Sequence, residues 1–156
     1  MQPSAELAWE SASMDGYVKG PYAAPDANVQ LRIRGMQAGE SGLRNLEADL
    51  SGTGGAIALR AILEGLRIPG APPDLFAAPM RVEATARLDD PARPVEFALR
   101  HPSLVVEARA TTAAGPSGTA NVMLPDLAAL AAAAGMDLAG RASIAIRFAT
   151  KADVTR

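Results

Sequence analysis

The sequence predicts an all-β protein: a curled, mainly antiparallel β-sheet that forms a groove, with one short helix. The best-defined segment is Met80–Leu88, where apolar residues alternate with Arg, Glu and Thr at the two-residue period of a strand. The same alternation recurs about every 8 to 20 residues along the chain, with mostly short turns between. Short connections favour antiparallel neighbours, because parallel strands need long crossovers.

The N-terminal region predicts little regular structure. Glycine and proline interrupt residues 1–28, so we expect an irregular segment with one short strand, over residues 7–11 or 17–19. Residues 29–150 would then form the groove, and residues 151–156 a tail.

Three strands are predicted in the first half of the groove, over residues 29–34, 45–51 and 56–64. The third of these also fits a helix, because Ala, Leu, Arg and Glu have good helix propensity. We favour the strand, since the preceding Gly52–Gly55 suits a hairpin. Residues 66–79 contain four prolines and predict an irregular loop.

Beyond Met80–Leu88, four more strands are predicted, over residues 95–100, 104–110, 118–124 and 140–149. The alternation stops between the last two. There, Asp126 is a suitable N-cap, the following alanines favour a helix, and Gly135 is a suitable stop. We therefore expect a helix over residues 126–135.

Composition narrows the functional classes. The net charge is −2 and no basic run is present, so we expect no nucleic-acid partner. The absence of cysteine excludes disulfides and thiolate metal sites. No apolar run approaches the roughly 20 residues of a membrane span, and residues 1–6 do not resemble a signal peptide. If the protein acts outside the cytoplasm, we expect this chain to be part of a longer one.

Three sequence features could suggest chemistry, and each has a simpler interpretation. His101 precedes a proline at a strand end and is interpreted as a turn residue. Asp89 and Asp90 could be paired carboxylates or calcium ligands, but Asp-Asp-Pro between strands favours a turn. Ser51–Gly55 lacks the Gly-Lys-Ser/Thr ending of a phosphate-binding loop. We expect no enzymatic activity, no metal and no cofactor.

The apolar side of the strands is the remaining candidate site. It could pack inside a closed sandwich or solenoid, as a structural interaction domain. Alternatively, it could form an open groove, since a large uncovered apolar surface usually marks an interaction site. The open groove would suit acyl chains or apolar peptide, and its inward residues would be Val82, Leu88, Phe97, Leu99, Val106, Val122, Ile144 and Ile146.

Four segments together resemble the TamB family, the inner-membrane-anchored subunits of the translocation and assembly module of Gram-negative bacteria, which are related to AsmA-like proteins. These segments are Gly20–Arg32, Ala56–Gly70, Ala84–Leu99 and Leu124–Gly140. The resemblance implies a β-taco, a long apolar groove that spans the periplasm. It also implies a parent chain whose membrane anchor and partner-docking region lie outside these residues.

The resemblance further implies a function in envelope biogenesis. The parent would work with TamA, an outer-membrane protein of the Omp85 type. It would transport phospholipid along the groove, or assist the assembly of outer-membrane proteins such as autotransporters during protein secretion. The expected partners are therefore phospholipid acyl chains or nascent outer-membrane β-strands. The family has no catalytic residues to transfer to this chain.

Overall fold

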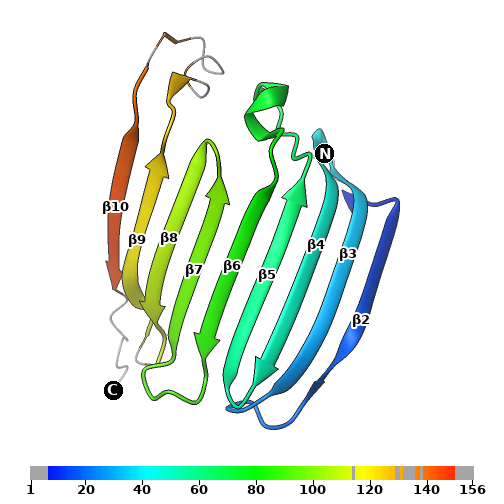
Figure 1. The fold of residues 1–156 in the computed structure, drawn as a ribbon, viewed down its shortest axis with the longest axis vertical. Coiled ribbons are helices and arrows are strands. Elements are labelled where there is room, and N and C mark those ends of the chain that lie inside the picture. Colours follow the sequence, from blue (N-terminus) through cyan, green and yellow to red (C-terminus); the bar gives the residue numbers. More distant parts are fainter. Residues whose placement is uncertain (1–6, 114, 129–130, 132–135, 138, 150–156) are drawn as a thin grey trace, which may run out of the picture.

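A computed structural model of the chain describes residues 7–113, 115–128, 131, 136–137 and 139–149. Ten strands form a single antiparallel sheet one layer thick (Figure 1), which confirms the predicted all-β fold class. The strands are β1 (Leu7–Ala8), β2 (Ser11–Lys19), β3 (Asp26–Ala38), β4 (Ser41–Thr53), β5 (Ala56–Glu64), β6 (Met80–Arg87), β7 (Pro94–His101), β8 (Leu104–Thr111), β9 (Ser117–Leu124) and β10 (Ala142–Ala149).

The strands follow one another across the sheet as a meander. From β3 to β10, each strand pairs antiparallel with the next strand in sequence. Both β1 and β2 pair with β3 in one continuous register, so together they form the first edge. The second edge is β10, and the two edges are not paired with each other.

The N-terminal segment differs from the prediction. The structure has strands at Leu7–Ala8 and Ser11–Lys19, where the sequence predicted an irregular stretch with one short strand. The alternation in Ala12–Val18 was hidden by Ser13 and Gly16. Residues 1–6 and the predicted tail, residues 151–156, lie outside the described part of the chain.

The other elements agree closely with the sequence pattern. β5 spans Ala56–Glu64, which confirms the strand interpretation of this segment. The proline-rich loop contains one 3-10 helix, η1 (Pro73–Phe76). In the predicted helix, the Asp126 carboxylate accepts a hydrogen bond from the Ala128 N–H, and the Ala131 N–H donates to the Leu127 carbonyl. Residues 129–130 and 132–135 of that prediction lie outside the described residues.

The sheet has no thick core. No large side chain is completely buried among the described residues, and the few buried apolar residues are Ala27, Leu43, Leu75, Met80 and Ala131. The chain exposes 11100 Å² of surface, whereas a compact monomer of 16.0 kDa would expose about 7,400 Å². The excess is expected for one layer of strands without a second layer packed on it.

The face opposite the apolar side chains is polar. Cross-strand ion pairs join Arg100 to Glu83 at 3.6 Å and Arg109 to Glu96 at 3.3 Å. All four side chains are more than half exposed, so each pair contributes little to stability. Their main effect is to keep this face in water.

Two glycines in one cross-sheet row provide a test of the packing between strands. A methyl group on Gly118 in β9 would overlap the Arg109 carbonyl oxygen, whereas one on Gly52 in β4 would meet its neighbours at 3.5 Å. Gly118→Ala should lower the free energy of unfolding by about 1–3 kcal/mol. Gly52→Ala should leave it unchanged or raise it by up to about 1 kcal/mol. Urea denaturation followed by circular dichroism measures both, and equal effects would contradict the described spacing of β8 and β9.

Candidate functional site

One side of the sheet carries an apolar surface that crosses β2 to β10. The strand registers align its side chains in four rows, and we call these rows the apolar face. The central row contains Met14, Leu31, Ala48, Ala61, Val82, Leu99, Val106, Val122 and Ile144. A neighbouring row contains Gly16, Val29, Leu50, Leu59, Ala84, Phe97, Ala108, Ala120 and Ile146.

The two outer rows are equally apolar, with one exception. One row runs from Val18 in β2 to Phe148 in β10. The other runs from Ala12 to Ala142, and it includes His101, which is the single polar residue in the four rows. With strands about 4.8 Å apart and alternate residues about 6.8 Å apart, the apolar face measures roughly 38 Å by 20 Å.

The structure brings all eight predicted groove residues to the apolar face or its end. Val82, Leu99, Val106, Val122 and Ile144 align in the central row. Phe97 and Ile146 belong to the neighbouring row. Leu88 follows β6, where its N–H extends the ladder by donating to the Gly55 carbonyl at 2.7 Å. Seven of the eight predicted residues therefore share one side of the sheet, and Leu88 lies at the end of its strand.

The predicted residues are only partly shielded from solvent. Six of them are half-buried, and the two on β10, Ile144 and Ile146, are 53% and 45% exposed. The part of the chain that the structure describes contains no second sheet to cover them. The arrangement is that of an open face, and the closed core of a sandwich is not present in these residues.

The sequence interpretation missed the contribution of β2. Met14 and Val18 lie on the apolar face at 76% and 65% exposure. They are four residues apart, which fits the two-residue period of a strand, but Gly16 at the position between them weakened this signal. The apolar face is therefore wider by one strand than the sequence indicated.

His101 ends β7 and is buried, which differs from the predicted turn residue. It is 5% exposed, and its ring lies 5.7 Å from the Phe76 ring of η1 at a 49° tilt. Its Nδ1 accepts a hydrogen bond from the Ser103 N–H at 3.2 Å, so the neutral ring carries its proton on Nε2. Nε2 is buried and contacts no acceptor among the described residues. η1 thus covers the apolar face at its one polar position.

The acidic turn after β6 has a structural role. The Arg87 guanidinium donates two hydrogen bonds to Asp89, at 3.0 and 2.9 Å, and this contact lowers the pKa of the Asp89 carboxyl and raises the pKa of Arg87. The Asp90 carboxylate accepts from the Ala92 N–H within the turn. Both carboxylates are thus hydrogen-bonded within the turn, Asp89 to a guanidinium and Asp90 to a backbone N–H.

The glycine-rich stretch Ser51–Gly55 belongs to the β4–β5 hairpin. Ser51 to Thr53 pair with β5, and Gly54 and Gly55 make the turn with positive φ angles of 60° and 88°. The strand that follows gives no helix N-terminus for a phosphate. This stretch therefore has the structure of a hairpin turn and not that of a strand–loop–helix phosphate site.

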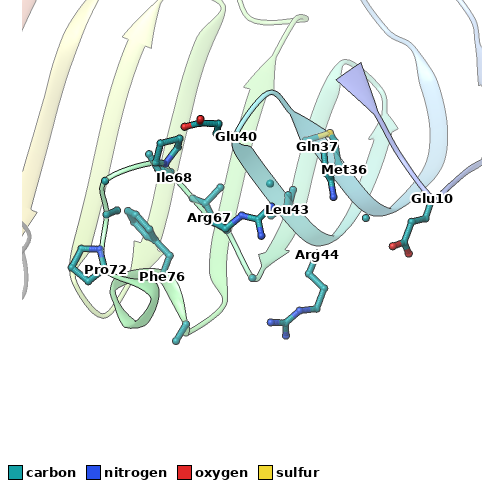
Figure 2. Close-up of a pocket in the computed structure, with 18 residues that line it drawn as sticks. Glu10, Met36, Gln37, Glu40, Leu43, Arg44, Arg67, Ile68, Pro72 and Phe76 are labelled. Carbon is teal, nitrogen blue, oxygen red and sulfur yellow. The ribbon is translucent and has the colours of Figure 1, made fainter. Parts of the chain in front are cut away.

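A hollow of about 710 Å³ lies between the start of β4 and the loop that leads from β5 to η1 (Figure 2). Arg67 and Leu43 lie at its centre, Phe76 lies at one side, and the Arg44 side chain points away from it (Figure 2). Arg67 pairs with Gly42 through two backbone hydrogen bonds, which hold the loop against β4. The hollow mixes apolar and charged groups of both signs, an arrangement without a clear ligand preference.

A second, shallower hollow of about 420 Å³ lies on the polar face and includes Glu83, Arg100 and Arg109. Two of its acids are already paired with arginines, so it is a solvated surface. Within the described residues, no group of His, Cys, Asp or Glu could hold a metal ion. The described residues also include no helix long and apolar enough to cross a membrane.

Comparison with known proteins identified no relative of this chain. No family model matches the chain, and neither curated proteins nor solved structures provide a match. The resemblance to the TamB family therefore stays a prediction, and the open apolar face is the feature on which a functional proposal can rest.

The Arg87–Asp89 contact gives a prediction about pH. Because Asp89 titrates at a lower pH in the folded chain than the usual value of about 3.9, its stabilising contact is present above that pH and is lost as the pH falls through the lower folded pKa. In Arg87→Gln, the pKa of Asp89 should rise toward the usual value, as measured by NMR titration of its carboxyl carbon. Arg93→Gln, in the same turn, should not change it, and an equal rise in both variants would contradict the assignment.

Proposed function

We propose that this chain is a segment of a periplasm-spanning envelope-biogenesis protein, and that its apolar face binds phospholipid acyl chains during transport. The observation that supports the proposal is the apolar face itself, which continues over β2 to β10 with no covering layer among the described residues. An uncovered apolar area of this extent is rare on a soluble monomer unless it has a binding partner.

The dimensions of the apolar face suit an acyl chain. Its extent of about 20 Å along the strands exceeds the roughly 15 Å depth of one leaflet of a bilayer core. Its extent of about 38 Å across the strands would let several chains lie side by side or move from strand to strand. A chain could thus transfer along the sheet without leaving the apolar surface.

The side-chain chemistry of the apolar face fits transport better than selective binding. Alanine, valine and leucine offer contact but no hydrogen bonds, and the one polar residue, His101, lies buried under η1. Each acyl methylene that leaves water contributes about 0.8 kcal/mol wherever it settles. Binding of this kind depends little on chain identity, which a conduit requires.

The open sheet edges favour a second candidate function. An extended outer-membrane β-strand, with alternating apolar and polar residues, could lie beside β2 or β10 and continue the apolar face. On this proposal, the parent would assist outer-membrane protein assembly together with a TamA-like Omp85 partner. Both candidates place the parent in the periplasm of a Gram-negative bacterium, anchored in the inner membrane by parts outside these residues.

Site-specific photocrosslinking tests the lipid proposal. Phe97 and Glu96 are neighbours on β7, and their side chains lie on opposite faces of the sheet. A benzoylphenylalanine probe at position 97 preserves an aromatic side chain on the apolar face, and the same probe at position 96 is the matched control. After irradiation with phosphatidylethanolamine and phosphatidylglycerol vesicles, mass spectrometry should detect a phospholipid adduct at position 97 at least several-fold more often than at 96.

The outcomes separate the candidates. Equal adducts at both positions, or none at either, would contradict lipid binding by the apolar face. The same probes in cells should give lipid-sized adducts for transport, and adducts with outer-membrane proteins for strand assembly. Crosslinks only within the chain would instead support a structural domain whose apolar face is covered.

A further inference from the structure

The hollow beside η1 adjoins the apolar face. The Phe76 ring lines the hollow and also packs on His101, the apolar-face residue that ends β7. Leu43 lies at the centre of the hollow, and it precedes Leu46 of the outer apolar row by three residues on β4. The hollow therefore lies at the end of the apolar rows, where a molecule that runs along β4 and β5 would reach it.

Charged side chains of both signs border the hollow. Among the described residues they are Glu10, Glu40, Arg44 and Arg67, and all four are exposed. The Arg67 side chain lies at the centre, whereas the Arg44 side chain points away (Figure 2). None of the ion pairs between described side chains includes any of the four. On the described surface, their charges are therefore available to a ligand.

The backbone fixes the position of Arg67. Its N–H donates to the Gly42 carbonyl at 2.7 Å, and its carbonyl accepts from the Gly42 N–H at 2.9 Å. The guanidinium lies against Gly42, where a methyl group on that glycine would be 3.2 Å from Nη2. Because glycine leaves this space free, a planar group with five N–H donors is held within the hollow. Such a group binds phosphate oxygens through paired hydrogen bonds.

The strands next to the hollow offer a path for acyl chains. From Leu46 and Leu63, the paired β4 and β5 present apolar side chains as far as Gly52 and Ile57. Six residues of strand give this path a length of about 20 Å. An amphiphile could therefore lay its chains on the apolar face and place its polar end in the hollow.

We propose that the hollow binds the head group of a zwitterionic phospholipid, a phosphate that carries an ammonium group, while the acyl chains lie along the apolar face. The Arg67 guanidinium donates to the phosphate, and the Glu10 and Glu40 carboxylates attract the ammonium. This inference rests on the proposed binding of acyl chains and adds the position and the charge of the head group.

The hollow and its surroundings favour this ligand over two others. The charges of the hollow alone select no ligand, but its position at the end of an apolar surface suits an amphiphile. An anionic phospholipid without an ammonium would contact Arg67 but leave both carboxylates without a cation. A free phosphate compound would lose the apolar contacts that drive burial. The volume of about 710 Å³ lies within the range of small-molecule sites, roughly 300–1,000 Å³.

NMR titration of the 156-residue chain tests the proposal. The ligand is dihexanoylphosphatidylethanolamine, kept below the concentration at which it forms micelles. The Gly42 amide reports on the hollow, the Leu59 methyl groups report on the apolar face, and both signals should shift with one dissociation constant. Phosphoethanolamine, which has no acyl chain, should bind far more weakly. Dihexanoylphosphatidylglycerol should bind several-fold more weakly, because it has no ammonium.

Two arginine variants form a matched pair. Arg67→Gln should weaken binding of the ethanolamine lipid about tenfold or more, because it removes a charge-assisted contact to phosphate. Arg44→Gln removes the same charge from the same border, but its side chain points away, so the affinity should be unchanged. Dihexanoylglycerol has no head group and should bind both variants equally. Circular dichroism checks that both variants keep the sheet.

A double variant tests the role of the carboxylates. Replacing Glu10→Gln and Glu40→Gln together removes the groups that attract the ammonium. The preference for the ethanolamine lipid over the glycerol lipid should then disappear, while the effect of Arg67→Gln should persist.

The outcomes separate this inference from the proposed function. A shift of the Leu59 signals without a shift at Gly42 would overturn the head-group site and leave acyl-chain binding intact. Equal losses in the two arginine variants would also overturn the site, as would equal affinity for the phosphatidylglycerol or for phosphoethanolamine alone. No shift of either signal would count against both the site and the proposed function.

Discussion

The backbone hydrogen-bond ladder between neighbouring strands is the interaction on which this structure depends. In a two-layer fold, apolar side chains from two elements bury one another, and the ladder positions them. Here the described residues form one layer, so each apolar side chain is shielded mainly by its cross-strand neighbours, as Val82 is by Ala61 and Leu99. A one-residue shift of register would move all these side chains to the polar face. Strict alternation of apolar and polar residues therefore fixes the register of each strand.

This single layer produces the apolar face to which we assign binding. Because no second layer among the described residues covers the apolar face, most of it is open to the acyl chains that we propose as its partner. The polar face, with ion pairs such as Arg109–Glu96, keeps the opposite side of the sheet in water.

One end of the apolar face is set by local exceptions to the strand pattern. At one end, η1 packs Phe76 against His101, the single polar residue of the four rows. Near the same end of β3 and β5, Gly35 and Gly65 adopt positive φ angles of 63° and 65°. The Glu10 and Arg44 side chains occupy the space that a methyl group on these glycines would need. A charged border therefore follows the apolar rows at this point.

The sequence by itself predicted the strands from residue 29 onward and the side chains that share a face, because successive side chains of a strand point to opposite faces. It did not reveal β1 and β2, whose serines and Gly16 hide the alternation, nor the extension of β3 through Gly35 to Ala38. Only the tertiary structure decided that the apolar face is open and that His101 is buried. The face is open because no second layer among the described residues packs over Val82. His101 is buried because the chain returns and packs Phe76 against the end of β7. Both depend on segments that are distant in the sequence, and no local pattern encodes them.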